Sequence, residues 1–214
     1  MDPNYSLHTR PSNAIVPKNH KDYFYIIFKR AIDIILSIFA IIICSPIVAI
    51  TAIFIKLDSK GPVFYKQQRI GINGKPFILL KLRSMNQDAE KDGAKWAEKN
   101  DDRITRVGRI IRKTRIDELP QLLNVLKGDM SIVGPRPERK VFIDEFSKQI
   151  PEFNNRLLVK PGLTGWAQVN GGYDLKPQEK IIYDCYYIKN RSLMLDIKCM
   201  IKTIKVILTQ SGAR

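Results

Sequence analysis

An acidic pair, Asp117-Glu118, follows a basic stretch that contains no acid and precedes an apolar segment with helical spacing, residues 119–126. Carboxylates in the first turn of a helix are favoured by its dipole, typically by about 0.3–1 kcal/mol, so the pair could simply begin that helix. A helix start among cations also binds phosphates, where one carboxylate can attack phosphorus and another can hold Mg²⁺. The pattern alone leaves both interpretations open. The cations of the stretch are Arg103, Arg106, Arg109, Arg112, Lys113 and Arg115.

Both histidines of the chain, His8 and His20, lie within its first twenty residues. The remainder therefore cannot form a Ser-His-Asp triad, a Cys-His pair or a histidine-ligated metal site. The sequence also lacks the glycine-rich fingerprints of P-loop and dinucleotide-binding proteins, and the D-x-D metal clamp of many nucleotide-sugar glycosyltransferases. A carboxylate is the nucleophile that the remaining side chains offer.

The chain is strongly basic: its 214 residues include 36 Lys and Arg against 21 Asp and Glu, a formal net charge of +15. This length suits one catalytic domain. The charge predicts an anionic partner, which could be nucleic acid, an anionic membrane surface or a phosphorylated substrate. Aromatic residues do not alternate with the cations of residues 103–115, which disfavours single-stranded nucleic acid. Three cysteines without C-x-x-C spacing are typical of reduced packing residues.

An apolar run covers residues 31–55 and contains one charge, Asp33. As a helix it would measure roughly 38 Å, enough to cross a hydrocarbon core of about 30 Å. Ser45-Pro46 near its middle predicts a kink or a break, because proline removes a backbone donor. Basic residues on both flanks favour a re-entrant helix whose two ends share one membrane face. A kinked single span and a buried helix of a soluble core are the alternatives.

The remaining segments predict a small α+β domain behind this helix. Residues 63–69 and 77–82 read as a β-hairpin around the Asn-Gly turn of residues 71–74. Residues 193–208 read as an amphipathic helix with lysines on its polar side, which would lie in the membrane interface or pack on the core. The other expected elements are helices at 119–126, 138–149 and 177–189, a strand at 130–133, extended segments in 157–170 and a helical loop at 87–100.

Several motifs, in the same order along the chain, resemble the signature of the bacterial sugar transferases, the monotopic polyprenyl-phosphate phosphoglycosyl transferases. The resemblance runs from about Lys29 to the C-terminus. The matching motifs are KGPVF (60–64), RIG (69–71), KLRSM (81–85), IDELPQL (116–122), NVLKGDMS (124–131), VGPRPE (133–138) and PGLTGWAQVNG (161–171). The chain is similar to the minimal form of the family, without the multi-span N-terminal half of its larger members.

The resemblance implies an enzyme that moves a sugar 1-phosphate from a UDP-sugar to undecaprenyl phosphate at the cytoplasmic face of the bacterial plasma membrane. UMP is released, and the product begins an exopolysaccharide, capsule or O-antigen-type glycan. Downstream glycosyltransferases would be partners, and a homodimer is compatible with the family. The implied organisation is a flexible lead at 1–28, a re-entrant membrane helix at 29–56 and a catalytic domain at 57–214.

The resemblance also assigns roles to individual residues. Asp117 would carry a covalent phosphosugar in a ping-pong reaction, and Glu118 would bind Mg²⁺. Lys81 and Arg112 match basic positions near this pair, while Pro135-Arg136-Pro137 and Glu138 match a loop associated with nucleotide binding; Glu138 favours a hexose donor. Lys29-Arg30 match a membrane anchor, and Ser45-Pro46 match the helix break. Gly172 departs from the family, many of whose members have arginine there, so either another cation would have to replace it or the sugar class differs.

Two other functions fit parts of the pattern. A membrane-tethered binding protein could hold nucleic acid or anionic lipid through residues 103–115, with an affinity that falls steeply with salt. A membrane phosphohydrolase could use Asp117 as nucleophile and water as acceptor. We expect the transferase, which contacts no nucleic acid.

Overall fold

The computed structural model describes residues 20–91, 93, 101–172 and 175–209. Helices and two small sheets make up this part of the chain, so the expected α+β class is confirmed. In chain order the elements are α1 (His20–Asp58), β1 (Phe64–Ile70), η1 (Ile72–Gly74), β2 (Pro76–Leu82), α2 (Arg106–Lys113), η2 (Ile116–Glu118), α3 (Gln121–Lys127), β3 (Ser131–Val133), α4 (Lys140–Gln149), η3 (Pro151–Leu158), β4 (Gly162–Thr164), α5 (Trp166–Asn170), α6 (Pro177–Asn190) and α7 (Leu193–Thr209).

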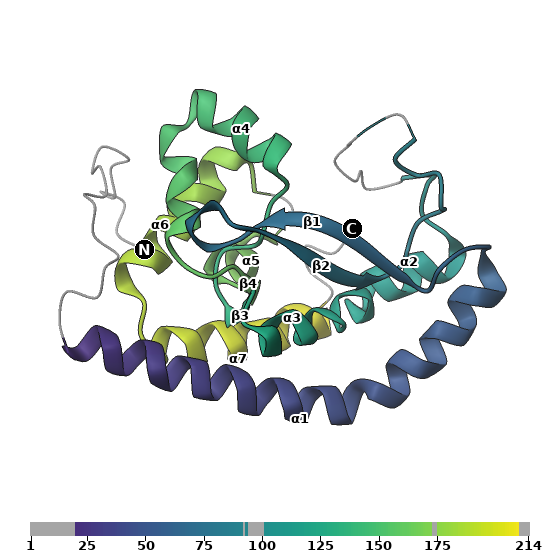
Figure 1. Cartoon of the computed structure of the whole chain (residues 1–214), viewed down its shortest axis with the longest axis horizontal. Coiled ribbons are helices and arrows are strands. Elements are labelled where there is room, and N and C mark those ends of the chain that lie inside the picture. The colour runs from purple at the N-terminus through teal and green to yellow at the C-terminus, as the bar shows by residue number, and fades with distance from the viewer. Residues whose placement is uncertain (1–19, 92, 94–100, 173–174, 210–214) are drawn as a thin grey trace.

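Helix α1 runs through Pro46 without interruption, so the expected break at Ser45-Pro46 is absent. Figure 1 shows it as one continuous, curved ribbon below the rest of the molecule. Proline 46 deprives the carbonyl of Ile42 of its helical N–H partner. The Ser45 hydroxyl donates a hydrogen bond to that same carbonyl at 3.0 Å. One side chain therefore satisfies the freed group, and the helix curves instead of ending.

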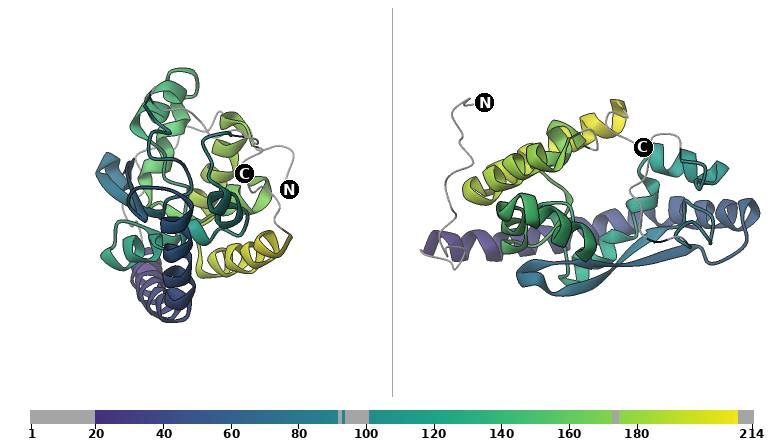
Figure 2. Two further views of the ribbon diagram at one scale, coloured as in Figure 1. Left: turned by 90° about the vertical axis from the view of Figure 1, so that its right-hand side faces the viewer. Right: turned by 90° about the horizontal axis from the view of Figure 1, so that it is seen from above.

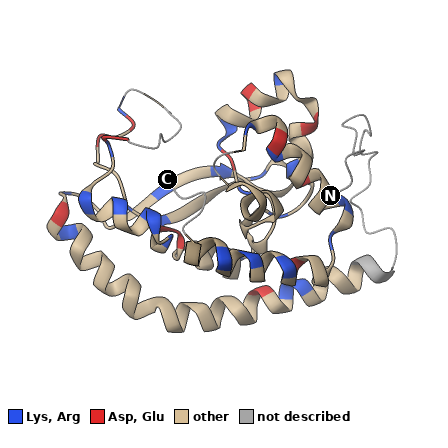
Figure 3. Cartoon of the chain, turned by 180° about the vertical axis from the view of Figure 1, so that it is seen from behind, with Lys and Arg blue, Asp and Glu red and all other residues tan. Residues whose placement is uncertain are grey.

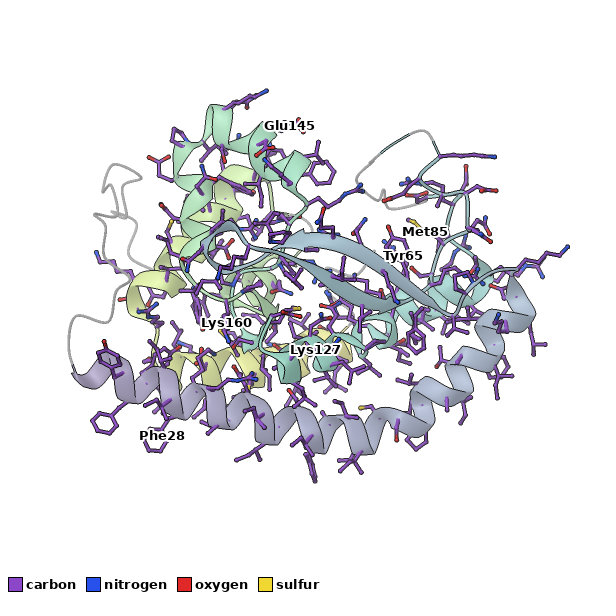
Figure 4. The ribbon with its side chains drawn as sticks, viewed as in Figure 1. Phe28, Tyr65, Met85, Lys127, Glu145 and Lys160 are labelled. Atoms are coloured by element: carbon purple, nitrogen blue, oxygen red, sulfur yellow. The ribbon has the colours of Figure 1, made fainter. Side chains whose placement is uncertain are left out.

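The apolar surface of α1 is exposed. The most apolar 18-residue window of α1 has a mean hydropathy of 2.8, and only 11% of that window is buried, unlike the core helix of a soluble protein. Phe28 points away from the remainder of the chain in Figure 4, and Lys and Arg gather toward the two ends of the helix in Figure 3. This helix is long and apolar enough to cross a membrane, and its exposed surface fits membrane association.

Polar contacts join α1 to the rest of the protein. The Lys29 ammonium lies 2.9 Å from the Asp196 carboxylate of α7. Arg30 donates to the carbonyls of Val125 and Leu126 at 2.6 and 2.7 Å, and so caps the C-terminal end of α3. Asp33, the one charge in the apolar run, accepts a hydrogen bond from the N–H of Ile132 at 3.1 Å. Lys29 and Arg30, expected as a membrane anchor, thus bind protein groups.

The far end of α1 also contacts the domain: the Asp58 carboxylate accepts a hydrogen bond from the N–H of Val107 at 3.0 Å, in the first turn of α2. Helix α7 lies beside α1 at one edge of the molecule when the structure is seen end-on (Figure 2, left). The expected C-terminal helix is therefore confirmed as a helix, and its exposed apolar residues include Ile197, Ile201 and Ile204.

The predicted hairpin is confirmed. Strands β1 and β2 pair antiparallel from Phe64 opposite Leu82 to Ile70 opposite Pro76. Residues Phe77 and Leu79 of β2 pack on α3 and the residues that follow it, around Val125 and Met130. Strands β3 and β4 form a second, parallel pair. The α3 helix contacts both of these sheets, and the acidic pair lies in η2, just before it.

The other predicted elements differ from the structure mainly at their ends. The expected extended segments in residues 157–170 are confirmed at Val159, β4 and Gly165, and are wrong at the ends, because residue 158 ends η3 and residues 166–170 form α5. Trp166 begins α5 and stacks on Tyr186 with ring centroids 5.8 Å apart, a contact that the local sequence does not reveal. Helix α1 begins at His20, within the expected lead. Residues 92 and 94–100 of the helical loop expected at 87–100 lie outside the described residues, as do residues 1–19.

Candidate active site

A tight turn presents Asp117 and Glu118 to strand β2. Arg115 adopts a left-handed backbone conformation, with φ of 58°, directly before η2. For a residue with a side chain this conformation typically costs about 1–2 kcal/mol. Pro120 then precedes α3 with the fixed φ that suits a helix start. The pair therefore lies between two helices, on a turn that is strained, and both side chains are buried.

Both carboxylates lie near the Lys81 ammonium, and Glu118 also contacts the Arg136 guanidinium. Lys81, from β2, lies 3.3 Å from Glu118 and 3.9 Å from Asp117. Arg136 contacts both carboxylate oxygens of Glu118, at 2.5 and 3.3 Å, in the fork geometry that binds carboxylates strongly. Lys81 and Arg136, both expected as binding residues, thus meet the predicted catalytic pair.

These environments separate the acidities of the pair. Burial raises the pKa of Asp117 to about 6, against the lowering effect of Lys81 and with a further increase from the Glu118 charge. Burial also disfavours the Glu118 carboxylate, but Arg136 and Lys81 outweigh it and hold the pKa of Glu118 well below its usual range. Near neutral pH both are ionised, and Asp117 is the more basic carboxylate.

Asp117 faces a cavity of about 270 Å³. Tyr65 and Met85, labelled in Figure 4, also line it. Its acidic lining residues are Glu90, Asp117 and Glu138, whereas the basic ones are Arg69, Lys81, Arg83, Arg103, Arg112, Arg136, Arg139 and Lys180. Eight cations against three carboxylates in a partly desolvated space favour a ligand with several negative charges. Arg112 of α2, predicted from sequence, is one of these cations.

The turn that carries Arg136 is held at every carbonyl from residue 135 to 138. Pro135 accepts from the N–H of Gly162, Arg136 from Arg156, Pro137 from Arg69, and Glu138 from the N–H of Ile70. A Cβ on Gly162 would lie 2.1 Å from the backbone nitrogen of Gly134, so the glycine allows the two segments to approach. The buried Pro135 and Pro137 therefore shape a rigid support for Arg136.

Glu138 belongs to a buried ion cluster behind this turn. Its carboxylate lies 3.3 Å from Lys180, 3.5 Å from Arg69 and 3.8 Å from Arg156. Arg156 in turn contacts Asp184 at 2.8 Å. Of the residues in this ion cluster, the sequence analysis predicted only Glu138 as a site residue. The spacing of Lys180 and Asp184, four residues apart within a predicted helix, was the available signal that they share a face.

Gly172 lines a second cavity of about 20 Å³, on another side of Arg136. Arg115, Arg156 and Lys180 contribute to the same lining. Cations therefore surround the position where the family resemblance leads one to expect arginine. Tyr173 and Asp174, the next residues of that departure, lie outside the described residues.

The described residues contain no group of three or more His, Cys, Asp or Glu side chains arranged to hold a metal. The oxygens of Asp117 and Glu118 are nevertheless suited to Mg²⁺, which often takes one or two carboxylates and completes its shell with water and substrate phosphates. The donor set therefore fits a magnesium ion that binds together with a phosphorylated ligand.

Together the fold and the site define a protein with an exposed apolar helix, a cationic cavity and a buried Asp-Glu pair beside that cavity. A protein of this class is suited to bind phosphorylated ligands at a membrane. The chain belongs to the bacterial sugar transferase family, whose model matches residues 24–210.

Three curated relatives give the similarity more detail. The UDP-N-acetylgalactosamine-undecaprenyl-phosphate N-acetylgalactosaminephosphotransferase of Aeromonas hydrophila is 47% identical over 211 residues, which cover 97% of this chain and 49% of the relative. A UDP-glucose:undecaprenyl-phosphate glucose-1-phosphate transferase of Caulobacter vibrioides is 43% identical, covering 86% and 71% of the two chains. The undecaprenyl-phosphate galactose phosphotransferase of Salmonella typhimurium is also 43% identical, covering 86% and 41%. The chain thus spans about half the length of the Aeromonas protein.

Proposed function

We propose that the protein is a phosphoglycosyl transferase that moves a sugar 1-phosphate from a UDP-sugar to undecaprenyl phosphate and releases UMP. The observation that carries this proposal is a buried carboxylate, Asp117, facing a cavity lined by eight cations. The names of the relatives support the lipid acceptor and the sugar phosphate. The lipid-linked sugar would then be a substrate for downstream glycosyltransferases.

The reaction would proceed in two displacements at one phosphorus atom. In the first, a carboxylate oxygen of Asp117 attacks the phosphorus that bears the sugar. The bond from that phosphorus to the bridging oxygen breaks, and UMP leaves with this oxygen and its electron pair. In the second, a phosphate oxygen of undecaprenyl phosphate attacks the same phosphorus, and the Asp117 carboxylate is released. Each displacement conserves the phosphoryl group, so the enzyme returns to its initial state.

The cations make an anionic nucleophile compatible with an anionic substrate. Lys81 lies close to both carboxylates, and Arg112 and Arg136 lie at the same cavity. Fixed positive groups of this kind stabilise charge on transferring phosphoryl groups without reorganisation during the reaction. Glu118 would hold Mg²⁺, which supplies charge neutralisation of the phosphates when bound. We expect chelation with EDTA to abolish transfer and added Mg²⁺ to restore it.

The membrane part of the proposal concerns α1. A re-entrant helix would keep both of its ends, and therefore the cavity, at the cytoplasmic face, where a UDP-sugar is available. Support comes from the basic flanks of the apolar run and from the curvature of the helix that contains Pro46 (Figure 1). Single cysteines at Tyr23 and Lys60, in a chain whose native cysteines are replaced by serine, test this. An impermeant maleimide outside spheroplasts should label neither; labelling of one would establish a single span.

The activity is tested by UMP release from UDP-N-acetylgalactosamine, UDP-glucose and UDP-galactose, with undecaprenyl phosphate and Mg²⁺ in detergent. Wild type is compared with Asp117→Asn. Release that requires lipid, metal and Asp117 supports the transferase, and the preferred donor identifies the sugar. Multiple-turnover release without lipid would identify a hydrolase, and no release from a folded, membrane-bound protein would favour a binding protein.

A further inference from the structure

Strand β2 has one edge paired with β1 and the other directed toward α3. Asn124 of α3, whose exposed fraction is only 1%, fills the position of a missing neighbour strand at that second edge. Its side-chain oxygen accepts from the N–H of Leu80 at 3.1 Å, and its side-chain nitrogen donates to the carbonyl of Ile78 at 2.7 Å. One amide therefore satisfies a donor and an acceptor of the strand, as an adjacent strand would.

This clamp sets the position of Lys81 along the strand. Lys81 follows Leu80 directly, and it has the same alternation as the buried residues Phe77 and Leu79, which face α3. A strand that slides by one residue turns every side chain to the opposite face. Because Asn124 holds two backbone groups of β2, it holds the strand in the register that directs Lys81 toward Asp117.

The same residue ends the helix that follows the acidic pair. The backbone carbonyl of Asn124 accepts from the N–H groups of Gly128, Asp129 and Met130, at 3.1 to 3.2 Å. Asn124 thus joins the end of α3 to β2, while the start of α3 lies directly after Glu118. Asn124 therefore joins helix α3 to strand β2 six residues after Glu118.

We infer that Asn124 is a positioning residue for the transfer reaction, which acts by holding Lys81 of β2 against the Asp117-Glu118 pair. This inference rests on the proposed function and assigns no contact between Asn124 and the substrate. It separates Asn124 from Leu122 and Val125, the buried apolar residues of α3.

The predicted consequence is a slower first displacement. Lys81 lies 3.9 Å from the Asp117 carboxylate and 3.3 Å from that of Glu118. When the clamp is lost and Lys81 withdraws, the anionic nucleophile loses a fixed cation that offsets its repulsion from the substrate phosphates, so the rate of transfer falls while binding elsewhere in the cavity is kept.

The test compares Asn124→Ala with Val125→Ala, a matched control in the same helix. Val125 is fully buried against β2 but makes no side-chain hydrogen bond. Asn124→Ala should lower kcat about tenfold and change KM less than about twofold. Val125→Ala should change kcat and KM less than about twofold. Asn124→Ser, which keeps one hydroxyl for the strand, replaces Asn124→Ala should the alanine variant fail to fold.

A double-mutant cycle with Lys81→Met separates positioning from general destabilisation. If Asn124 acts through Lys81, adding the Asn124 substitution to Lys81→Met should cost less than about twofold further. Additive losses would overturn the inference. So would unchanged hydrogen exchange at the Leu80 amide in NMR spectra of folded Asn124→Ala, because this amide loses the acceptor that holds β2. The exchange measurement requires no turnover, so it can fail or succeed independently of the proposed activity.

Discussion

Asp117 and Glu118 are adjacent in the chain, yet their surroundings move their pKa values in opposite directions. Glu118 receives the guanidinium of Arg136 on both oxygens, whereas Asp117 is nearest to an ammonium at 3.9 Å. A pair of acids with separated pKa values is a common way to divide two tasks within one site. Here the more basic carboxylate is suited to attack on phosphorus, and the permanently ionised one is suited to bind cations.

The raised pKa of Asp117 predicts a pH dependence of the first displacement. Below about pH 6 the carboxyl is protonated and cannot attack, so kcat/KM for the UDP-sugar should fall about tenfold per pH unit. Above about pH 6 it should reach a plateau. Stopped assays of UMP release between pH 4.5 and 8.5, at constant ionic strength, measure this limb. A flat profile across pH 6 would contradict the assignment of Asp117 as the nucleophile.

The same shift predicts that the site reduces stability. A carboxyl whose folded pKa of about 6 lies above its unfolded value of 3.8 costs stability that develops between about pH 3.8 and 6 and is complete above pH 6, because the folded state must then hold the buried charge. Asp117→Asn removes that cost and should stabilise the protein at pH 7.5 by about 2–3 kcal/mol, while it abolishes transfer. Thermal unfolding in detergent should show this gain at pH 7.5 and much less at pH 4.5. Equal gains at both would indicate another cause.

At the scale of elements, sequence patterns identified the hairpin, the helices after residue 119 and the long apolar helix. Each of these elements has a hydrophobic pattern that lies within one continuous segment of the sequence. The contacts that build the site join distant segments, so no local pattern reveals them. Arg156 reaches the carbonyl of Arg136, and Asp33 reaches the N–H of Ile132. The prediction of a break at Pro46 was wrong since the Ser45 hydroxyl replaces the missing hydrogen bond. Asp117, Glu118 and Arg136 were predicted as site residues because they lie in the motifs at 116–122 and 133–138.

Helix α2 packs so closely that a single methyl group should displace it. A Cβ on Gly108 would lie 1.9 Å from the carbonyl oxygen of Ser84. Backbone on both sides cannot yield locally, so Gly108→Ala should destabilise the protein by about 1–3 kcal/mol and move Arg112 relative to the cavity. Thermal unfolding and KM for the UDP-sugar measure the two effects. Lys113→Ala, a change at an exposed position of the same helix, is the comparison, and equal stability of both variants would refute the close contact.

At the scale of the whole molecule, one carboxylate connects both ends of the chain. Asp196 of α7 accepts from Lys29 and Tyr25 of α1, at 2.9 and 3.0 Å, and from Tyr187 of α6 at 2.7 Å. Because the first and last helices meet at this buried group, the position of α1 relative to the cavity depends on it. The interaction explains a lysine at the start of an apolar helix without invoking a lipid partner.

Removing Lys29 alone should therefore be costly. Lys29→Met leaves Asp196 buried without this counter-ion. Because two tyrosines still donate hydrogen bonds to Asp196, we expect the free energy of unfolding to fall by about 3 kcal/mol. Combining it with Asp196→Asn should recover part of that loss. Lys140→Met, which breaks the exposed pair with Asp144, should change stability by less than about 0.5 kcal/mol. Unfolding curves in one detergent compare the three, and equal losses for Lys29→Met and Lys140→Met would exclude the proposed connection.

The contacts of Arg30, Asp33 and Asp58 limit how the protein can be made soluble in water. They satisfy the last carbonyls of α3, an N–H of β3 and an N–H at the start of α2. A truncation that begins after residue 58 would remove all three at once and leave buried backbone groups exposed or unpaired. We therefore expect the apolar helix and the remainder of the chain to fold as one cooperative unit, and a soluble version to require polar substitutions on the exposed face of α1 rather than deletion of the helix.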